Sequence, residues 1–244
     1  MTHPLITTLP HTLKSYEVLE TGEIRPRILF NLFQDMADIS AEKLGFGRTF
    51  CQEQHKLWVG SFYHVHLLDP LMWGDDLMFE TWPSGASLIT ATRDFRVLKN
   101  GEAVALATSQ WVLLDAATLR PVKLAPYLSE REVLSKRALD LPFTTPQEVT
   151  EPEFTKTYDV LYDYIDVNQH VNNAVYPALA AESVQDTFKK SHRVKEIAVA
   201  FKQSARLGDT ITAKTKFADN TSYHALTNTE GKDFARVQLV WENR

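Results

Sequence analysis

The sequence contains a single cysteine, Cys51, among its 244 residues. One thiol cannot form an internal disulfide bond, so the fold does not depend on cross-links, and nothing indicates an oxidising compartment. No apolar run approaches the roughly 20 residues that a membrane-spanning helix needs. The first residues also lack the basic start and apolar run of a signal peptide. These absences predict a cytoplasmic protein without a membrane span.

An excess of basic residues is also missing. There are 26 Lys and Arg residues against 31 Asp and Glu residues, which gives a formal net charge of -5 and a pI of about 5.9. Binding to phosphate backbones normally requires a basic face, so the charge argues against nucleic acid as the main partner. The hydrophobic fraction of 44% is typical of a globular protein that can bury a real core.

Several common catalytic motifs are absent. The chain has no G-x-S-x-G elbow and no P-loop, and Gly45-Phe46-Gly47 lacks the third glycine and the strand context of a dinucleotide site. His64 and His66 alternate on a predicted strand, but no further Cys or His cluster supports a metal site. The sequence therefore predicts no metal and no cofactor.

The first half reads as one helix followed by an antiparallel sheet. Apolar residues recur at three- and four-residue steps from Leu29 to Leu44, and Gly45 and Gly47 follow as a stop signal. Asn100-Gly101 predicts a tight hairpin turn. Strands are expected near 13–19 and over 57–68, 76–82, 89–98 and 103–114. This order is typical of an α+β fold.

The pattern then restarts after a proline-rich stretch. Ser129-Glu130-Arg131-Glu132 has the form of a capping box and predicts a short helix to about Arg137. Three short matches relate the halves in the same order: Tyr16–Leu19 with Tyr158–Leu161, Gly74 with Gly208, and Trp111 with Trp241. We therefore predict an N-terminal half over 1–125, a linker with a short helix over 126–153, and a C-terminal half over 154–244.

The stretch from Tyr164 to Tyr176 concentrates polar chemistry before a predicted helix. Asp166, Asn168 and His170 alternate with other residues, so an extended backbone would point all three to one side. Asn172 or Asn173 would then cap the helix, whose free amide groups favour partial negative charge. A carboxylate, an amide and an imidazole beside such a helix start suggest acyl transfer.

This D-x-N-x-H-V-N-N stretch, with Tyr176 and Glu182 after it, resembles the second half of acyl-acyl-carrier-protein thioesterases. Further stretches resemble the first half of that family: Leu57–Val59, Trp73–Leu77, Arg93–Phe95 and Trp111–Asp115. The resemblance implies an α+β fold of two tandem hot-dog halves, each an antiparallel sheet wrapped around a central helix. It also implies hydrolysis of fatty acyl-acyl carrier protein to free fatty acid and carrier, with the carrier protein as partner.

The same residues support specific catalytic roles. His170 could act as general base on water, because histidine side chains titrate near neutral pH, and its alternative is a surface histidine. Asn168 could orient that water or donate to the thioester oxygen. Asp166 could orient either of them, or be an ordinary loop carboxylate. Between Glu20 and Leu29 the first half has neither Asn nor His, so we expect one site per chain.

Two further positions depend on the helix and the strand after it. Glu182 falls on the apolar stripe of the predicted helix, so it is either a buried acid that assists His170 or an edge residue paired with a Lys or Arg. Plant members of the family carry a Glu on the following strand, and here Ser204 lies nearest that position, with Ala205 nearest a neighbouring Cys. This departure leaves Ser204 as an additional site candidate and excludes a cysteine nucleophile.

Basic residues gather after the predicted second helix, where they either mark a solvated helix end or form a docking site for an acidic carrier protein. They are Lys189, Lys190, Arg193 and Lys195. The sequence also leaves open an acyl-CoA thioesterase, a non-catalytic acyl-binding module and, with a poorer fit, a 3-hydroxyacyl dehydratase on the same fold. A homodimer is compatible with all of these.

Overall fold

The computed structural model describes residues 3–128 and 133–244 and divides into two compact units. Unit 1 comprises the chain up to Ile24 and Asn31–Phe143, and unit 2 comprises Arg25–Phe30 and Thr144–Arg244. Within the described residues, no helix is long and apolar enough to span a membrane. The chain changes units after Phe143, inside the stretch predicted as a linker.

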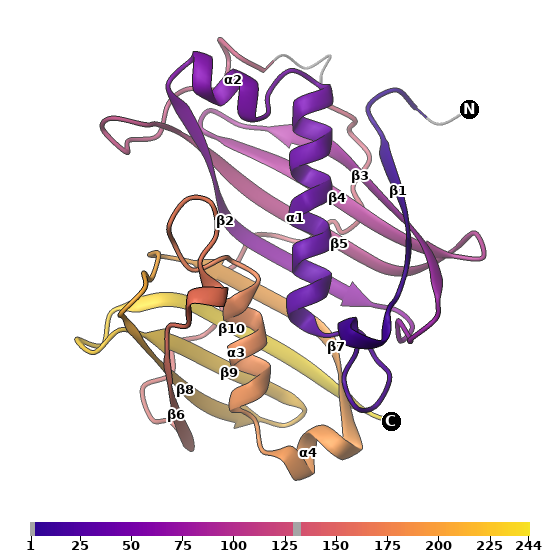
Figure 1. Cartoon of the computed structure of the whole chain (residues 1–244), viewed down its shortest axis with the longest axis vertical. Helices are drawn as coiled ribbons and strands as arrows, with labels where there is room; N and C mark the ends of the chain where they lie inside the picture. Colours follow the sequence, from indigo (N-terminus) through magenta and orange to yellow (C-terminus); the bar gives the residue numbers. More distant parts are fainter. Residues whose placement is uncertain (1–2, 129–132) are drawn as a thin grey trace. The chain divides into compact units, whose positions relative to one another are not determined.

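Unit 1 is an antiparallel sheet with the order β1-β3-β4-β5-β2 and a long helix on one face (Figure 1). Its elements are β1 (Thr7–Thr12), the 3-10 turn η1 (Ser15–Glu17), α1 (Pro26–Lys43), α2 (Arg48–Glu53), β2 (Lys56–Leu67), β3 (Asp76–Ala86), β4 (Thr90–Lys99) and β5 (Glu102–Asp115). Phe33 of α1 packs its ring against Phe79 and Phe95, at centroid distances of 6.1 and 4.8 Å. The apolar stripe of α1 therefore covers the sheet, as the hot-dog fold requires.

Unit 2 repeats this plan with a shorter helix (Figure 1). Its sheet has the order β7-β10-β9-β8-β6, and α3 packs against β6, β8, β9 and β10. The elements are β6 (Phe154–Asp159), the 3-10 turn η3 (Tyr162–Tyr164), α3 (Val175–Ser183), α4 (Asp186–Ser191), β7 (His192–Phe201), β8 (Thr210–Ala218), β9 (Thr221–Thr227) and β10 (Asp233–Asn243). The predicted fold class is confirmed.

The predicted elements are largely correct, with three exceptions. The strand expected near 13–19 lies earlier, as edge strand β1, where Pro10 is tolerated because an edge strand can leave one side of its ladder unbonded. The short helices α2 and α4 were not predicted. The helix expected from Ser129 to Arg137 is wrong in its second part: 129–132 lie outside the described residues, and Val133–Arg137 form no helix.

Equivalent backbone hydrogen bonds confirm the internal repeat and correct its alignment. Leu13 N–H donates to Asp75 O at 3.0 Å, and Val160 N–H donates to Asp209 O at 3.0 Å. The offsets are 160 - 13 = 147 and 209 - 75 = 134. The predicted match of Gly74 with Gly208 therefore holds, whereas Tyr16 does not correspond to Tyr158, because the true offset there is 147 and not 142.

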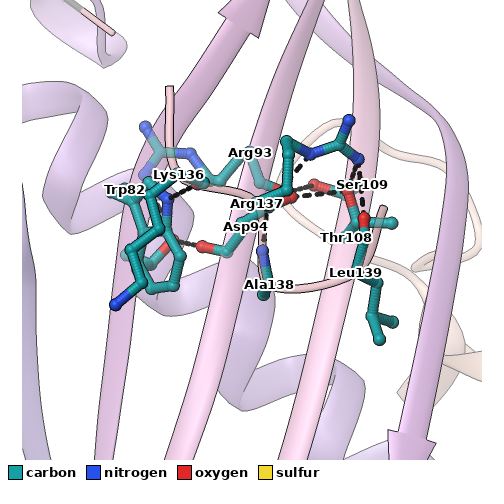
Figure 2. A network of polar contacts seen from close by, with 10 residues as sticks. Trp82, Arg93, Asp94, Thr108, Ser109, Lys136, Arg137, Ala138 and Leu139 are labelled. Carbon is teal, nitrogen blue, oxygen red and sulfur yellow. Dashed lines mark hydrogen bonds and ion pairs between the residues drawn. The ribbon is translucent and has the colours of Figure 1, made fainter. Parts of the chain in front are cut away.

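The segment after Val133 lies over the sheet of unit 1 and is held by a buried carboxylate, as Figure 2 shows. Asp94 is fully buried and accepts hydrogen bonds from Ala138 N–H at 2.6 Å, Thr108 Oγ1 at 2.5 Å and Arg137 Nε at 3.1 Å. Burial raises the pKa of Asp94, and these donors oppose that shift. Trp82 Nε1 adds a bond to Lys136 O at 2.7 Å. The predicted linker is thus fixed by polar contacts and needs no helix.

A second buried polar network lies inside unit 2. His224 is fully buried, and its Nδ1 lies 2.9 Å from Thr215 Oγ1 and 3.2 Å from Ser183 Oγ. Its Nε2 lies 2.8 Å from Ser222 Oγ, which also accepts a bond from Trp241 Nε1. Burial lowers the pKa of His224 to about 3, so the imidazole stays neutral in the folded protein.

We expect Asp94→Ala to destabilise the protein by roughly 3 kcal/mol or more, because it removes the negative partner of Arg137 and leaves Arg137 Nε and the Ala138 N–H without their acceptor. Urea denaturation measures this free energy of unfolding. The matched control is Asp76→Ala, which removes an exposed carboxylate bonded to Thr12 on the same sheet and should cost less than about 1 kcal/mol. Equal losses in the two variants would contradict the role of Asp94.

We expect the free energy of unfolding to fall as the pH drops below about 6.5, because His224 binds a proton in the unfolded state but not in the folded state. The folded pKa lies below the unfolded value, so this contribution is complete above pH 6.5 and decreases by about 1.4 kcal/mol per pH unit towards pH 3. Urea midpoints at pH 7, 6 and 5 measure it. His224→Gln should flatten the slope and the exposed His3→Gln should not; an unchanged slope in His224→Gln argues against this source.

Candidate functional site

The polar stretch of the second half forms a tight turn and not the predicted extended strand. Ile165 and Val171 form an isolated β-bridge, and Asp166 N–H donates to His170 O at 2.9 Å. Gln169 N–H donates to Asp166 O at 3.0 Å, and Gln169 has a φ of 63°. We call residues 166–170 the polar turn. The expectation of three side chains on one face of an extended backbone was wrong, because these bonds reverse the chain.

Unit 1 contains the same turn with different side chains. Leu19 N–H donates to Glu23 O at 2.8 Å, and Gly22 N–H donates to Leu19 O at 2.9 Å, which are the equivalent bonds at an offset of 147. Gly22, with φ of 82°, corresponds to Gln169. A left-handed backbone suits glycine and is uncommon for other residues, and such strain gathers at functional sites. The second copy alone combines this strain with an amide and an imidazole.

The side chains of the polar turn divide into one that shapes it and two that are accessible. Asp166 Oδ1 accepts the Asn168 N–H at 2.8 Å, so this carboxylate stabilises the turn backbone. Asn168 is exposed and His170 is half-buried, and among the described residues neither side chain has a hydrogen-bond partner. Both polar groups are therefore available to a substrate or to water.

Two neighbouring segments hold the polar turn in place. Val171 N–H donates to Ala205 O at 2.8 Å, and Ala205 N–H donates to the hydroxyl of Tyr176 at 3.0 Å. Burial, and then the nearby carboxylates of Asp209 and Asp166, raise the pKa of Tyr176 to about 12. Tyr176 belongs to α3, so this chain of bonds ties the turn, the loop after β7 and the helix into one rigid group.

The residues just before the polar turn are fixed by an arginine. Arg27 Nη1 lies 2.8 Å from Asp163 Oδ2, and Arg27 Nη2 donates to Asp163 O at 2.7 Å. The guanidinium also lies over the Tyr164 ring at 5.4 Å from its centroid. Tyr164 O accepts the Asn172 N–H at 2.8 Å. No local sequence pattern indicates the arginine contact, because Arg27 precedes the polar turn by more than a hundred residues.

The start of α3 offers fewer free donors than predicted. Asn172 accepts the Ala174 N–H with Oδ1 at 2.8 Å and the Val175 N–H with its carbonyl at 2.9 Å. Pro177, the third residue of the helix, has no N–H. The prediction that Asn172 caps this end is confirmed in part, since it bonds the amide before the helix. An oxyanion would depend more on the Asn168 side chain than on the helix start.

The prediction of a buried Glu182 was wrong. Its side chain is 56% exposed and lies 3.2 Å from Lys156 Nζ and 3.3 Å from Lys189 Nζ. The buried member of this helix turn is Ser183, which bonds into the His224 network. The buried stripe of α3 passes through Tyr176, Ala180 and Ser183, so Glu182 lies beside the stripe and not on it. The open alternative of an edge residue paired with lysines describes the observed geometry.

Ser204 lies in the loop after β7 and not on a strand. β7 ends at Phe201, and the Ser204 side chain is exposed. Its neighbour Ala205 is the buried residue whose backbone bonds Val171 and Tyr176. The loop therefore does lie against the polar turn, as the resemblance implied, but the backbone of Ala205 makes the contact.

The basic cluster is largely neutralised by carboxylates. As predicted, the cluster follows α3: Lys189 and Lys190 lie in the short helix α4, and Arg193 and Lys195 lie on β7. Lys189 pairs with Glu182 and Asp186, while Arg193 and Lys195 both pair with Glu242. Four positive charges and three negative ones leave a net charge of +1 (4 - 3).

Unit 1 holds an apolar pocket between α1 and its sheet. Its cavity volume is about 70 Å³, below the range of roughly 300–1,000 Å³ typical of small-molecule pockets. Trp58, Trp111, Leu44, Phe46 and Leu128 form much of the wall. The sequence could not distinguish this pocket from a filled core, because both use the same apolar residues.

The two strand histidines lie together on β2. Their Nε2 atoms are 3.2 Å apart, and the ring centroids are separated by 4.9 Å. The alternation expected for His64 and His66 on one strand face is thus observed. No function is assigned to this pair.

Comparison with known proteins agrees with this architecture. The model of the acyl-ACP thioesterase N-terminal domain matches residues 6–131, and that of the C-terminal domain matches residues 147–243. Oleoyl-acyl carrier protein thioesterase 1 of Arabidopsis thaliana is 26% identical over 90% of this chain and 67% of the relative. Dodecanoyl-[acyl-carrier-protein] hydrolase of Cinnamomum camphora is 25% identical over 98% of this chain and 68% of the relative.

Solved structures share the complete fold. The 12:0-ACP thioesterase from Umbellularia californica is 21% identical with a TM-score of 0.87, and each chain is covered fully. An acyl-ACP thioesterase from Bacteroides thetaiotaomicron is 19% identical with a TM-score of 0.86, over 97% of this chain and 98% of the other. Since the two family models together match most of the sequence, the chain belongs to the acyl-ACP thioesterase family.

Proposed function

We propose that the polar turn of unit 2 carries out the thioester hydrolysis by which the enzyme releases free fatty acid from acyl-acyl carrier protein. The activity itself follows from the family. The observation that supports the assignment of the site is the shared turn: both units build the same backbone, but only residues 166–170 carry an accessible amide and imidazole on it.

His170 is assigned as the general base. It removes a proton from a water molecule, which then attacks the thioester carbonyl carbon. Asn168 donates its side-chain amide to the carbonyl oxygen, which becomes negative as the tetrahedral intermediate forms. The carbon–sulfur bond then breaks, and the proton held by His170 passes to the leaving thiolate. The Asp166 carboxylate preserves the geometry of the turn by accepting a hydrogen bond from the backbone N–H of Asn168.

We do not assign Glu182 and Ser204 a part in the hydrolysis. The Glu182 carboxylate is engaged by two lysines, and we assign it to the attachment of α3 to β6 through Lys156. Ser204 is exposed beside Ala205 and stays a prediction, as does a cytoplasmic location.

We propose that the pocket of unit 1 takes the acyl chain. Its walls are mainly apolar side chains, which favour hydrocarbon through the release of water. Docking of the carrier at Lys189, Lys190, Arg193 and Lys195 also remains a prediction. Because three of these four cations are ion-paired, Lys190 is the best single position at which to test it.

We expect His170→Ala and Asn168→Ala each to lower kcat for an acyl-acyl carrier protein by roughly 100-fold or more, since loss of a general base or an oxyanion donor typically costs this much. Release of free carrier thiol measures the rate, and circular dichroism checks the fold. The matched control is Val167→Ala in the same turn: Val167 is 93% exposed, and its truncation should leave the rate near native. Near-native turnover in either test variant would refute the assignment.

The same assay on matched acyl-CoA thioesters addresses the rival substrate. We expect the carrier-protein thioester to be hydrolysed with the higher kcat/KM. A preference for acyl-CoA would reassign the substrate while leaving the polar turn as the site, because the same residues would act on the same bond.

We expect Tyr176→Phe to lower kcat by roughly 10-fold with little change in KM, because the Ala205 amide loses its acceptor and the polar turn shifts relative to the substrate carbonyl. Steady-state kinetics separate the two constants. Tyr158→Phe is the matched control, since Tyr158 also bonds α3, through Leu179 O at 3.4 Å, without touching the turn. A similar fall in kcat in both variants would indicate general destabilisation of the unit.

A further inference from the structure

The two histidines of β2 lie on the face of the unit 1 sheet that points away from α1. Their neighbours Tyr63 and Val65 are fully buried. The Tyr63 ring stacks on Phe95 at a centroid distance of 6.1 Å, on the side of the sheet that α1 covers. Side chains alternate along a strand, so His64 and His66 project from the other face, where both are half-buried. The pair therefore belongs neither to the core nor to the polar turn.

The distance between the two imidazoles matches that between two ligands of one metal ion. Their Nε2 atoms lie 3.2 Å apart. Zinc–imidazole bonds are about 2.0–2.1 Å long, and zinc sites are commonly tetrahedral. Two nitrogens held at that length and at a tetrahedral angle lie roughly 3.3–3.4 Å from each other. The observed separation is close to this value, so both rings can bind one ion with almost no movement.

The folded sheet holds the two rings near each other without an ion. Phe62 is buried, and its ring packs against Phe143 at a centroid distance of 5.3 Å and against His64 at 6.5 Å. Strand β2 pairs with β5 along its length, with Leu106 opposite His66. Because the backbone and the His64 ring are already ordered, little conformational entropy is lost when an ion binds. The pair is therefore preorganised by the fold.

The hydrogen bond between the two rings is compatible with metal binding. In this bond one Nε2 donates a proton and the other accepts it. A metal ion replaces the hydrogen bond by two metal–nitrogen bonds, after the donor ring has moved its proton to Nδ1 or released it to water. Neutral imidazole suits Zn²⁺, Cu²⁺ and Ni²⁺, whereas Mg²⁺ and Ca²⁺ prefer oxygen ligands. The chemistry of the pair therefore selects a transition metal.

We propose that His64 and His66 bind one divalent transition-metal ion, with Zn²⁺ as the reference case, through their Nε2 atoms. Alternation along a strand does not set the distance between the two rings, so the sequence alone did not favour this site. Resident zinc sites use three or four protein ligands. Since the pair supplies two, we expect an ion that exchanges with solvent. The inference does not depend on the proposed function of the polar turn.

Titration calorimetry of the native protein with zinc chloride tests the proposal. We expect a site for one Zn²⁺ per chain and much weaker binding of Mg²⁺. His64→Gln and His66→Gln should each raise the dissociation constant by about 100-fold or more, since even the loss of a hydrogen bond to a metal ligand costs roughly 10- to 100-fold. The proposal is overturned if native protein binds no Zn²⁺, if Mg²⁺ binds equally tightly, or if both variants keep the native affinity.

Two control variants exclude other groups that bind metals. His55→Gln removes an exposed histidine just before β2, and Cys51→Ser removes the single thiol of the chain. Both variants should bind Zn²⁺ with the native affinity. If either control loses the site while His64→Gln keeps it, the ion binds elsewhere and the proposal is wrong.

Measurements on native protein keep the proposal testable if the variants fail to fold. Zn²⁺ should shift the ring nitrogen resonances of two histidines in nitrogen-15 NMR spectra, which are assigned to His64 and His66 by sequence. It should also raise the thermal midpoint, because the folded strand binds the ion better than the unfolded chain does. Shifts confined to other histidines, or an unchanged midpoint, would contradict the proposal. Neither measurement involves thioester hydrolysis, so its outcome is separate from that of the proposed function.

Discussion

The backbone bonds across the polar turn are the constraint on which the candidate site depends. The bond from Asp166 N–H to His170 O closes a five-residue turn and forces Gln169 into a left-handed conformation. The same bonds in unit 1 hold Gly22, for which that conformation is easy. The two units therefore share the backbone of the turn. Unit 2 differs in its side chains: Gln169 adopts the strained left-handed conformation, and Asn168 and His170 supply two polar groups in fixed positions.

A strained turn is useful only if its surroundings hold it. Two bonds through Ala205 connect the turn to α3, one from the Val171 N–H to the Ala205 carbonyl and one from the Ala205 N–H to the Tyr176 hydroxyl. Arg27 fixes the residues before the turn. Deeper in unit 2 the His224 network bonds Ser183 at the end of the same helix. Helix α3 thus has specific polar contacts at both ends. Preorganisation of this kind matters because small displacements of a base or a donor cost large factors in rate.

Sequence reasoning predicted the parts of the fold that are set by periodicity. The spacing of apolar residues located α1 and strands β2 to β5, and Asn100-Gly101 located a turn whose two residues do have positive φ angles. It failed where side chains from distant segments decide the structure. The capping-box pattern at 129–132 predicted a helix to about Arg137, but Arg137 and Ala138 instead donate hydrogen bonds to the buried carboxylate of Asp94. Glu182 was predicted on the buried stripe because of its spacing from Val175 and Leu179, whereas the stripe is centred on Tyr176, Ala180 and Ser183.

The candidate site was predicted in identity but not in geometry. The residue types identified Asp166, Asn168 and His170 as candidates, since few other stretches combine a carboxylate, an amide and an imidazole. Their alternation, taken alone, predicted an extended backbone. The turn requires a bond between Asp166 and His170 that no two-residue period reveals. The roles of Ala205 and Arg27 are carried by backbone atoms and by a partner far away in sequence, so the sequence contains no local pattern for them.

The adjacent residues Arg93 and Asp94 show how burial decides the number of protein partners that a charged side chain needs. Neighbours on a strand point to opposite faces. Asp94 is fully buried and meets three donors, which account for its bonding capacity and fix the segment above it. Arg93 lies on the pocket side, with one long bond to Thr81. Arg93 is only half-buried, so water can complete its bonding, whereas no water reaches Asp94. The unequal number of protein partners therefore follows from the unequal exposure of the two side chains, because an unpaired charge costs more where solvent cannot reach it.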